Sequence, residues 1–323
     1  MLLSLAAVVV GIVVLVWSAD RFVDGAVQVA RHYNMPTFLI GMVIIGFGTS
    51  APEMIVSAVS ALQGNPQIAL GNAYGSNITN IALILGITAL MKPILVDKNA
   101  LTREMPILLA VTALAIVQLY DLSVSRFDAI LMLFVFAVVM ARNIYNGKRS
   151  RVAFLENQEP IEKKITLGKS VFFLILGLVF LIISSRLLVW GAVSIAHYFG
   201  VSDLLIGLTI VAIGTSLPEL ASSIAAVRKG ENDIALGNVL GSNLFNTLAV
   251  VGIAGLISPM KADPEILYRD LPIMAFLTLI LIPMAFRRQK ENRINRISGF
   301  ILVLCYASYI AFLIVSTYAA KAL

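Results

Sequence analysis

The sequence predicts an all-α polytopic membrane protein whose ten transmembrane helices form two inverted five-helix repeats. Two observations lead to this fold class: the apolar composition of the chain, and a polar motif that occurs twice, 166 residues apart, within apolar sequence. A third observation, the uneven distribution of basic residues between the connecting loops, predicts how the helices are oriented in the membrane.

The composition excludes a soluble domain. Of the 323 residues, 59% are hydrophobic and 13% are charged, whereas soluble domains average about half and about a quarter. Ten apolar stretches are long enough to cross about 30 Å of hydrocarbon. They lie near residues 2–18, 36–62, 68–91, 104–120, 126–144, 170–197, 202–227, 233–257, 270–286 and 297–318.

The motif Gly-Thr-Ser-x-Pro-Glu occupies residues 48–53 and returns at residues 214–219. In both places Gly-Asn-x-x-Gly-Ser-Asn-x-x-Asn follows, at 71–80 and 237–246, and roughly half of positions 48–80 are identical to their counterparts. Such a match indicates an internal duplication. Five spans per repeat is an odd number, so the second repeat must enter the bilayer from the opposite side.

Basic residues concentrate in one set of loops. If the N-terminus lies outside, eighteen Lys and Arg residues fall on the inner side, against four on the outer side: Arg126, Lys261, Arg269 and Lys321. The positive-inside rule then predicts that both termini lie outside. The net charge of +6 therefore indicates membrane topology and not nucleic-acid binding. The predicted division is a first repeat (1–142, motif region 46–86), a cytoplasmic linker (143–169) and a second repeat (170–323, motif region 212–252).

The motif introduces a carboxylate, Glu53, into an apolar span. On a helix, Thr49 and Ser50 precede Glu53 by four and three residues, so two hydroxyls and the carboxylate share one face. Pro52 has no backbone N–H and its ring disturbs the preceding turn, so we expect a kink that frees backbone oxygens. Such a break is tolerated in a membrane only where it lines a cavity or is buried in protein.

The second repeat supplies an equivalent set of polar side chains. Related by a pseudo-twofold axis, the two repeats predict a cage of oxygen ligands near the middle of the membrane. Its members are Glu53, Thr49, Ser50, Ser76, Asn77 and Asn80 with Glu219, Thr215, Ser216, Ser242, Asn243 and Asn246. Oxygen ligands suit Ca2+ and Na+, whereas Zn2+ or Cu2+ prefer imidazole or thiolate. The repeated motif contains no Lys or Arg, so the expected counter-ion is a transported cation.

The two motifs closely resemble the alpha-1 and alpha-2 repeats of the cation/Ca2+ antiporter superfamily, in particular the prokaryotic Na+/Ca2+ exchangers. The resemblance implies that Glu53 and Glu219 are the central ligands shared by Ca2+ and Na+. It further implies hydroxyl or backbone oxygens from Thr49, Ser50, Thr215 and Ser216, carbonyl oxygens from Gly46 and Ala212, and flanking Na+ sites at Ser76, Asn80, Ser242 and Asn246. The implied location is a prokaryotic inner (plasma) membrane.

Two differences between this sequence and other branches of the superfamily bear on which ion drives transport. Some of them, including the K+-dependent branch, carry an acidic residue at the position of Asn246, whereas Asn80 and Asn246 are both neutral here. The H+-coupled branch usually places a Glu in the Gly-Asn segment, which here reads Gly71-Asn72-Ala73-Tyr74-Gly75. We therefore expect a secondary antiporter that exchanges Na+ for Ca2+ by alternating access. The alternative is a Ca2+/H+ exchanger in which the two glutamates carry the protons.

Two other classes of protein, a cation channel and a membrane enzyme, fit these sequence features less well. A cation channel needs a continuous path and favours rings of ligands from several subunits. An integral-membrane enzyme would need a nucleophile with a base, or metal-binding histidines, beside the carboxylates. We expect neither an enzyme nor a bound cofactor, and the expected partners are Ca2+, Na+ and the lipid bilayer.

Overall fold

The computed structural model describes residues 1–155, 166–201, 206, 209–210, 212–286 and 291–322. Nine helices among these residues are long and apolar enough to cross a membrane, and the chain is an integral, multi-pass membrane protein. The predicted span at 202–227 lies partly outside the described residues, which here include α10 (Ala212–Thr215) and α11 (Leu217–Arg228). The predicted all-α fold class is confirmed.

The elements of the two repeats correspond in order. The first repeat contains α1 (Leu2–His32), α2 (Thr37–Ile40), the π-helical segment η1 (Gly41–Ile45), α3 (Gly46–Leu62), α4 (Gln67–Ile78), η2 (Thr79–Leu85), α5 (Gly86–Met91), β1 (Ile94–Leu95), η3 (Ala100–Glu104), α6 (Met105–Gln118), β2 (Ser123–Val124) and α7 (Arg126–Leu155). The second contains α8 (Leu167–Tyr198), α10, α11, α12 (Asn232–Leu244), η5 (Phe245–Val250), α13 (Val251–Ile257), β3 (Met260–Lys261), η6 (Ile266–Asp270), α14 (Leu271–Ala285), β4 (Arg293–Ile294) and α15 (Arg296–Ala322). Even the π-helical segments η3 and η6 are 166 residues apart, so the duplication extends to local irregularities of the helices.

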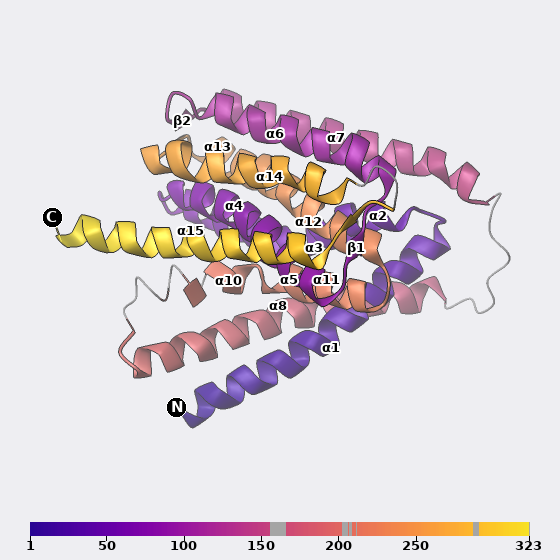
Figure 1. Cartoon of the computed structure of the whole chain (residues 1–323), viewed down its shortest axis with the longest axis horizontal. Coiled ribbons are helices and arrows are strands. Elements are labelled where there is room, and N and C mark those ends of the chain that lie inside the picture. The colour runs from indigo at the N-terminus through magenta and orange to yellow at the C-terminus, as the bar shows by residue number, and fades with distance from the viewer. Residues whose placement is uncertain (156–165, 202–205, 207–208, 211, 287–290, 323) are drawn as a thin grey trace.

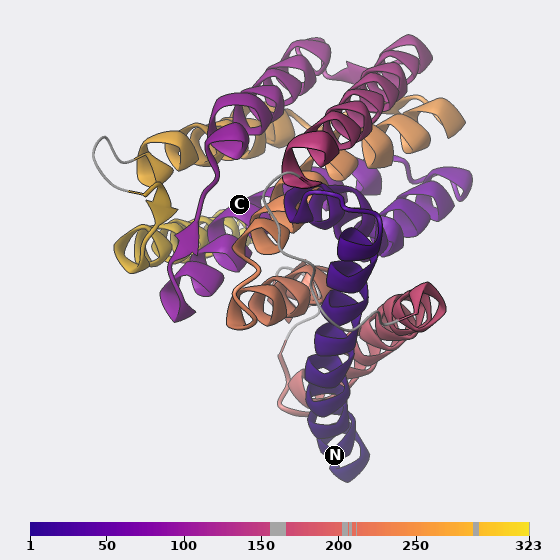
Figure 2. The same cartoon turned by 90° about the vertical axis from the view of Figure 1, so that its right-hand side faces the viewer.

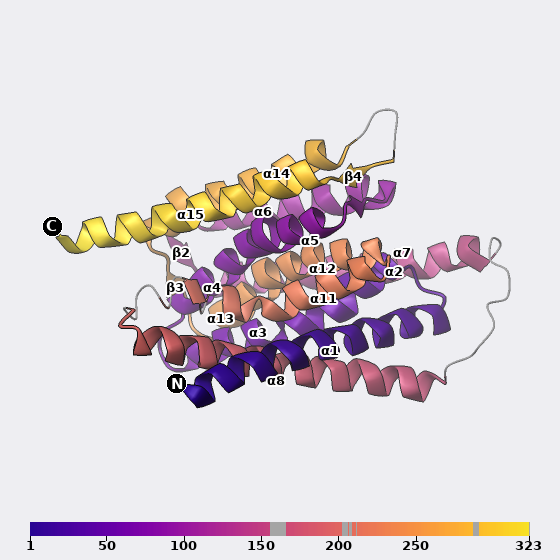
Figure 3. The same ribbon diagram turned by 60° about the horizontal axis from the view of Figure 1, so that its bottom comes forward.

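Two small sheets show that the repeats are inverted. β1 pairs antiparallel with β4, and β2 pairs antiparallel with β3. β1 and β3 occupy equivalent positions of the two repeats, yet their sheets lie at opposite ends of the helical bundle (Figures 1 and 3). Both chain termini lie at the end that carries β2 and β3. Each repeat therefore runs through the bundle in the opposite sense to the other.

The first helices of the two repeats pack against each other as an antiparallel pair, beside the rest of the bundle (Figure 2). Glycines let the backbones approach closely: a Cβ on Gly177 would lie 2.5 Å from the backbone nitrogen of Phe22. The equivalent contact, between Gly11 and Leu188, repeats this geometry in the other direction. Small residues at such crossings are typical of helices packed inside membranes.

The core of the bundle is formed by the two helices that follow the carboxylate motifs. The spans Gln67–Met91 and Asn232–Ile257 are the most buried ones, with 72% and 83% of their apolar windows inside the protein. Gly237 and Gly241 of α12 pack directly on the backbone of α2 and η1, at Phe38 and Met42. The polar residues that follow each Gly-Asn segment are thereby held in the centre of the molecule.

The close crossing of α1 and α8 predicts that Gly177→Leu lowers the melting temperature of the detergent-purified protein by several degrees. The added side chain must push the two backbones apart, and overpacking of this kind costs about 1–3 kcal/mol. Gly168→Leu, on the same helix, is the control, because no described residue lies within 4 Å of its Cβ position. Equal melting temperatures for the two variants would contradict this account of the crossing.

Candidate functional site

The two carboxylates lie on helices of different local structure. Glu53 is near the middle of α3, which continues without interruption through Pro52. In the second repeat the helix ends at Thr215, and α11 restarts at Leu217, after Ser216 with φ −95° and ψ 9°. The break expected beside the motif proline is therefore present only in the second repeat. There the proline falls in the first turn of a new helix, where its missing N–H is not needed.

Glu53 and Glu219 are 2% and 1% exposed, and neither forms an ion pair with a described Lys or Arg. The hydroxyl of Ser50 donates a hydrogen bond of 3.3 Å to Oε1 of Glu219 and so links the two repeats. Both carboxylate oxygens of Glu53 and the Oε2 atom of Glu219 lack a hydrogen-bond partner among the described residues. Carboxylates buried in this way cost free energy unless a positive charge compensates them.

Two asparagine amides of the first repeat are held by their nitrogen atoms, whereas the buried amide of Asn246 has no hydrogen-bond partner among the described residues. Asn77 donates from Nδ2 to the hydroxyl of Thr247 at 2.7 Å, and Asn80 donates from Nδ2 to Oδ1 of Asn243 at 3.0 Å. Each of these bonds joins the first repeat to the second. The Oδ1 atoms of Asn77 and Asn80 are left without a hydrogen-bond partner among the described residues.

Seven buried side-chain oxygens of the predicted cage lack a hydrogen-bond partner within the described part of the chain. They are Oε1 and Oε2 of Glu53, Oε2 of Glu219, Oδ1 of Asn77, Oδ1 of Asn80, Oδ1 of Asn246 and the hydroxyl oxygen of Ser216. Buried polar atoms are hydrogen-bonded in the great majority of cases. A concentration of unpaired oxygens with two carboxylates has the chemistry of a site for a hard cation such as Ca2+ or Na+.

The other predicted residues lie around this group. Thr49 donates to the carbonyl of Ile45 at 3.0 Å and lies 3.5 Å from the hydroxyl of Ser242, across the repeat boundary. Gly46 packs against the backbone of Gly241 and Ser242. Ser76, Ser242 and Asn243 are buried, Thr215 borders a cavity that contains Glu53, and Ala212 begins α10.

Asn72 and Asn238 were not among the predicted site residues, yet they orient the carboxylate helices. Asn72 donates to the backbone carbonyl of Glu53 at 3.3 Å, and Asn238 donates to that of Glu219 at 3.2 Å. Asn238 also accepts a hydrogen bond of 3.2 Å from Thr49, so it connects both repeats. Their identity at the same offset was a signal for this role, but the partner was visible only in the structure.

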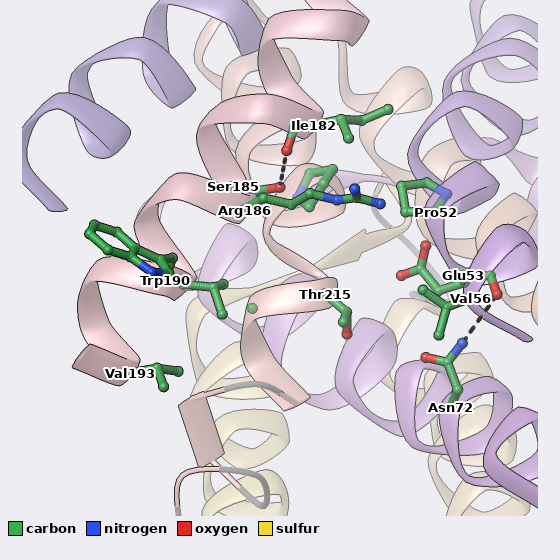
Figure 4. Close-up of a pocket in the computed structure, with 13 residues that line it drawn as sticks. Pro52, Glu53, Val56, Asn72, Ile182, Ser185, Arg186, Trp190, Val193 and Thr215 are labelled. Atoms are coloured by element: carbon green, nitrogen blue, oxygen red, sulfur yellow. Dashed lines mark hydrogen bonds between the residues drawn. The ribbon is translucent and has the colours of Figure 1, made fainter. Parts of the chain in front are cut away.

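A cavity of about 290 Å3 leads away from Glu53. Its walls come from α3, α4, α8, α10 and α11, and Figure 4 shows Glu53, Thr215 and Arg186 around it. On α8 the lining residues continue from Arg186 to Trp190 and Val193, toward the helix end at Tyr198. The cavity therefore extends from the carboxylate toward the end of the bundle that carries β2 and β3.

This fold and this site define a class of protein. Inverted helical repeats that meet at two buried carboxylates and a group of unpaired oxygens are typical of a secondary transporter for cations.

Comparison with known proteins gives the family. The family described as "Sodium/calcium exchanger protein" matches residues 3–145 and 169–315. The chain is 47% identical over 312 residues to "Putative antiporter CaxA" of Alkalimonas amylolytica, covering 96% of this chain and 98% of that protein. It is 42% identical over 299 residues to "Inner membrane protein YrbG" of Escherichia coli, covering 90% and 91%. The chain belongs to the sodium/calcium exchanger protein family.

A solved structure agrees with this assignment. The sodium-calcium exchanger NCX_Mj superposes with a TM-score of 0.82 and 32% sequence identity, covering 96% of this chain and 98% of that chain. The protein is therefore a cation/Ca2+ antiporter, a transporter and not an enzyme, as the sequence predicted.

The hydrogen bonds of Asn238 predict that Asn238→Ala lowers the free energy of unfolding by about 1–3 kcal/mol, because buried partners are left unpaired. Asn72→Ala is the matched control: the equivalent side chain is only part-buried and donates only within its own repeat. Thermal unfolding of both purified variants measures the difference. A larger loss for Asn72→Ala would contradict the assignment of Asn238 as a connection between the repeats.

Proposed function

We propose that the protein exchanges Na+ for Ca2+ across the membrane by alternating access, at a site formed by Glu53 and Glu219. The observation that carries this proposal is the group of seven unpaired, buried oxygens contributed by both repeats. The names of relatives support the choice of ions, since NCX_Mj is a sodium-calcium exchanger. Ca2+ and Na+ bind at the same oxygens in turn, and each ion compensates the buried carboxylates.

The proposed ligands fall into three groups. Glu53 and Glu219 bind both ions at the centre of the site, near the middle of the membrane. Hydroxyl, amide and carbonyl oxygens complete the coordination, from Thr49, Ser50, Asn77, Gly46, Thr215, Ser216, Asn243 and Ala212. Na+ binds on the flanks, at Ser76 and Asn80 in one repeat and at Ser242 and Asn246 in the other.

The charge of the site constrains the coupling. With Asn80 and Asn246 neutral, Glu53 and Glu219 bring two negative charges, which one Ca2+ neutralises. Exchange of three Na+ for one Ca2+ moves one net charge, which corresponds to about 2.3 kcal/mol per 100 mV of membrane potential. An inward Na+ gradient then drives Ca2+ export.

The proposed membrane arrangement follows the positive-inside rule. The repeats are residues 1–142 and 170–323, joined by a cytoplasmic linker at 143–169, with both termini outside. In support, Arg31, Lys92 and Lys229 lie at the ends of α1, α5 and α11, at the end of the bundle that carries β1 and β4, away from the termini. The printed name of the Escherichia coli relative supports a prokaryotic inner membrane.

Purified protein in liposomes separates Na+ coupling from H+ coupling. We expect Ca2+ uptake when an outward Na+ gradient is imposed, and no uptake with a pH gradient alone at zero Na+. Protein-free liposomes with ionophore-set gradients give the background rate. Uptake driven by the pH gradient and not by Na+ would replace the proposal with a Ca2+/H+ exchanger that uses the same glutamates.

Glu53→Gln and Glu219→Gln should each abolish Ca2+ exchange, because one negative charge is too few to compensate Ca2+ in a buried site. Glu231→Gln, which alters a carboxylate paired with Arg31 at the helix ends, is the control and should retain exchange. Binding also stabilises the folded state, so Ca2+ should raise the melting temperature of the wild type and not of the two variants. Retained exchange in either variant would refute the proposed site.

A further inference from the structure

Arg186 is an arginine within a membrane-spanning helix, α8. It is exposed, and it forms no hydrogen bond or ion pair with any residue that the structure describes. Arginine inside a membrane costs several kcal/mol unless a charged group or water compensates it, so such a residue is a candidate for a function. The proposed mechanism above assigns it none.

The side chain of Arg186 borders the same cavity as Glu53 and Thr215. Figure 4 shows its guanidinium group directed from α8 toward the α3 wall, where Pro52 and Glu53 lie. The two unpaired oxygens of Glu53 and the unpaired guanidinium thus lie along one cavity, which is partly open at its Arg186 side. Most other residues that line the cavity are apolar, including Ile182, Val189 and Val193, and none of them is charged.

The equivalent position of the first repeat carries the opposite charge, because Asp20 lies 166 residues before Arg186. The Nζ atom of Lys229, the residue after α11, lies 3.8 Å from Oδ1 of Asp20 and 2.6 Å from Oδ1 of Asp24, both on α1. The pseudo-twofold axis exchanges the two ends of the bundle. The position that holds an arginine in the second repeat therefore holds an aspartate in the first.

A second cavity, of about 260 Å3, lies toward the end of the bundle that carries β1 and β4. Three carboxylates border it, those of Asp97, Glu104 and Asp233, together with one arginine, Arg103. This cavity has an acidic lining, whereas Arg186 places a positive charge at the cavity that contains Glu53. The cavities toward the two ends of the bundle therefore differ in the charges that line them.

We propose that Arg186 determines a side-specific cation affinity: it competes with the transported ion for Glu53 and weakens cation binding from the end that carries β2 and β3. The inference rests on the proposed role of Glu53 as an ion ligand. When Ca2+ leaves through this cavity, the guanidinium moves toward Glu53 and replaces part of the lost positive charge. An entering cation must displace it.

The charge of the ion decides how strongly it is affected. Coulomb energy is proportional to the product of the charges, so Arg186 opposes Ca2+ twice as strongly as a single Na+ at the same place. On that side of the membrane the residue therefore lowers the affinity of Glu53 for Ca2+ more than its affinity for a single Na+. If the termini lie outside, this is the side to which an exporter must release Ca2+.

The test measures the KM for Ca2+ separately at each face, by Ca2+ self-exchange in right-side-out and in inverted membrane vesicles that contain the full-length protein. Self-exchange requires no coupling ion, so the result does not depend on whether Na+ or H+ drives transport. For Arg186→Gln we expect the KM for Ca2+ to fall about tenfold at the face that carries β2 and β3, a change equivalent to about 1.4 kcal/mol. At the other face the KM should stay unchanged. Because Arg186 is exposed, the substitution removes little packing.

Two further variants separate charge from structure. Arg186→Lys keeps the positive charge and should retain the wild-type KM at both faces. Arg21→Gln, which removes an arginine of α1 that stacks on Phe173 and does not border the cavity, should change neither KM. An unchanged KM in Arg186→Gln, an equal change at both faces, or the same change in Arg186→Lys would each overturn the inference.

Glu53→Gln is measured in the same vesicles. Loss of self-exchange in this variant with no effect of Arg186→Gln would refute only the role of Arg186. Retained self-exchange in Glu53→Gln would refute the proposed site itself.

Discussion

The structure depends on one electrostatic constraint: two carboxylates, Glu53 and Glu219, are buried in a membrane-spanning bundle, and no Lys or Arg in the described part of the chain is paired with either. An ionised carboxylate in such a position is unstable unless a positive charge is present. A mobile cation meets this requirement and can leave again, which a permanently paired lysine or arginine could not do. The same constraint explains why unpaired side-chain oxygens gather around the two carboxylates.

The inverted duplication is a direct way to build such a site. Each repeat supplies one carboxylate and one asparagine-rich helix. The side-chain nitrogens of Asn77 and Asn80 donate the hydrogen bonds to the second repeat, so their amide oxygens take no part in these bonds. Close glycine crossings, such as Gly177 on Phe22, and the direct packing of Gly241 on Met42 bring other helices of the two repeats close together. Packing without large side chains is therefore part of how the two repeats come together.

The repeat, the apolar spans and the set of polar residues could be predicted from the sequence because they depend on composition and on the spacing of residues along one helix. The partners of Asn72 and Asn238 could not, since a hydrogen bond to the carbonyl of Glu53 or Glu219 depends on how two helices pack. The sequence also could not predict that the helix continues through Pro52 but restarts just before Pro218. The two motifs are nearly identical, and only the tertiary environment distinguishes a continuous helix from one that restarts.

Departures from symmetry carry information that the repeated motif does not. Two identical repeats would present the same electrostatic approach at both ends, and a transporter built from them would bind its ions equally well from either side. In this chain Arg186 corresponds to Asp20, and the cavity nearest β1 is bordered by three carboxylates. On the proposed function the motif residues bind the ions, and the unmatched charges around them differ between the two ends of the bundle. The proposed role of Arg186 then makes the affinity for Ca2+ differ between the two faces, while the ion gradients set the direction of net transport.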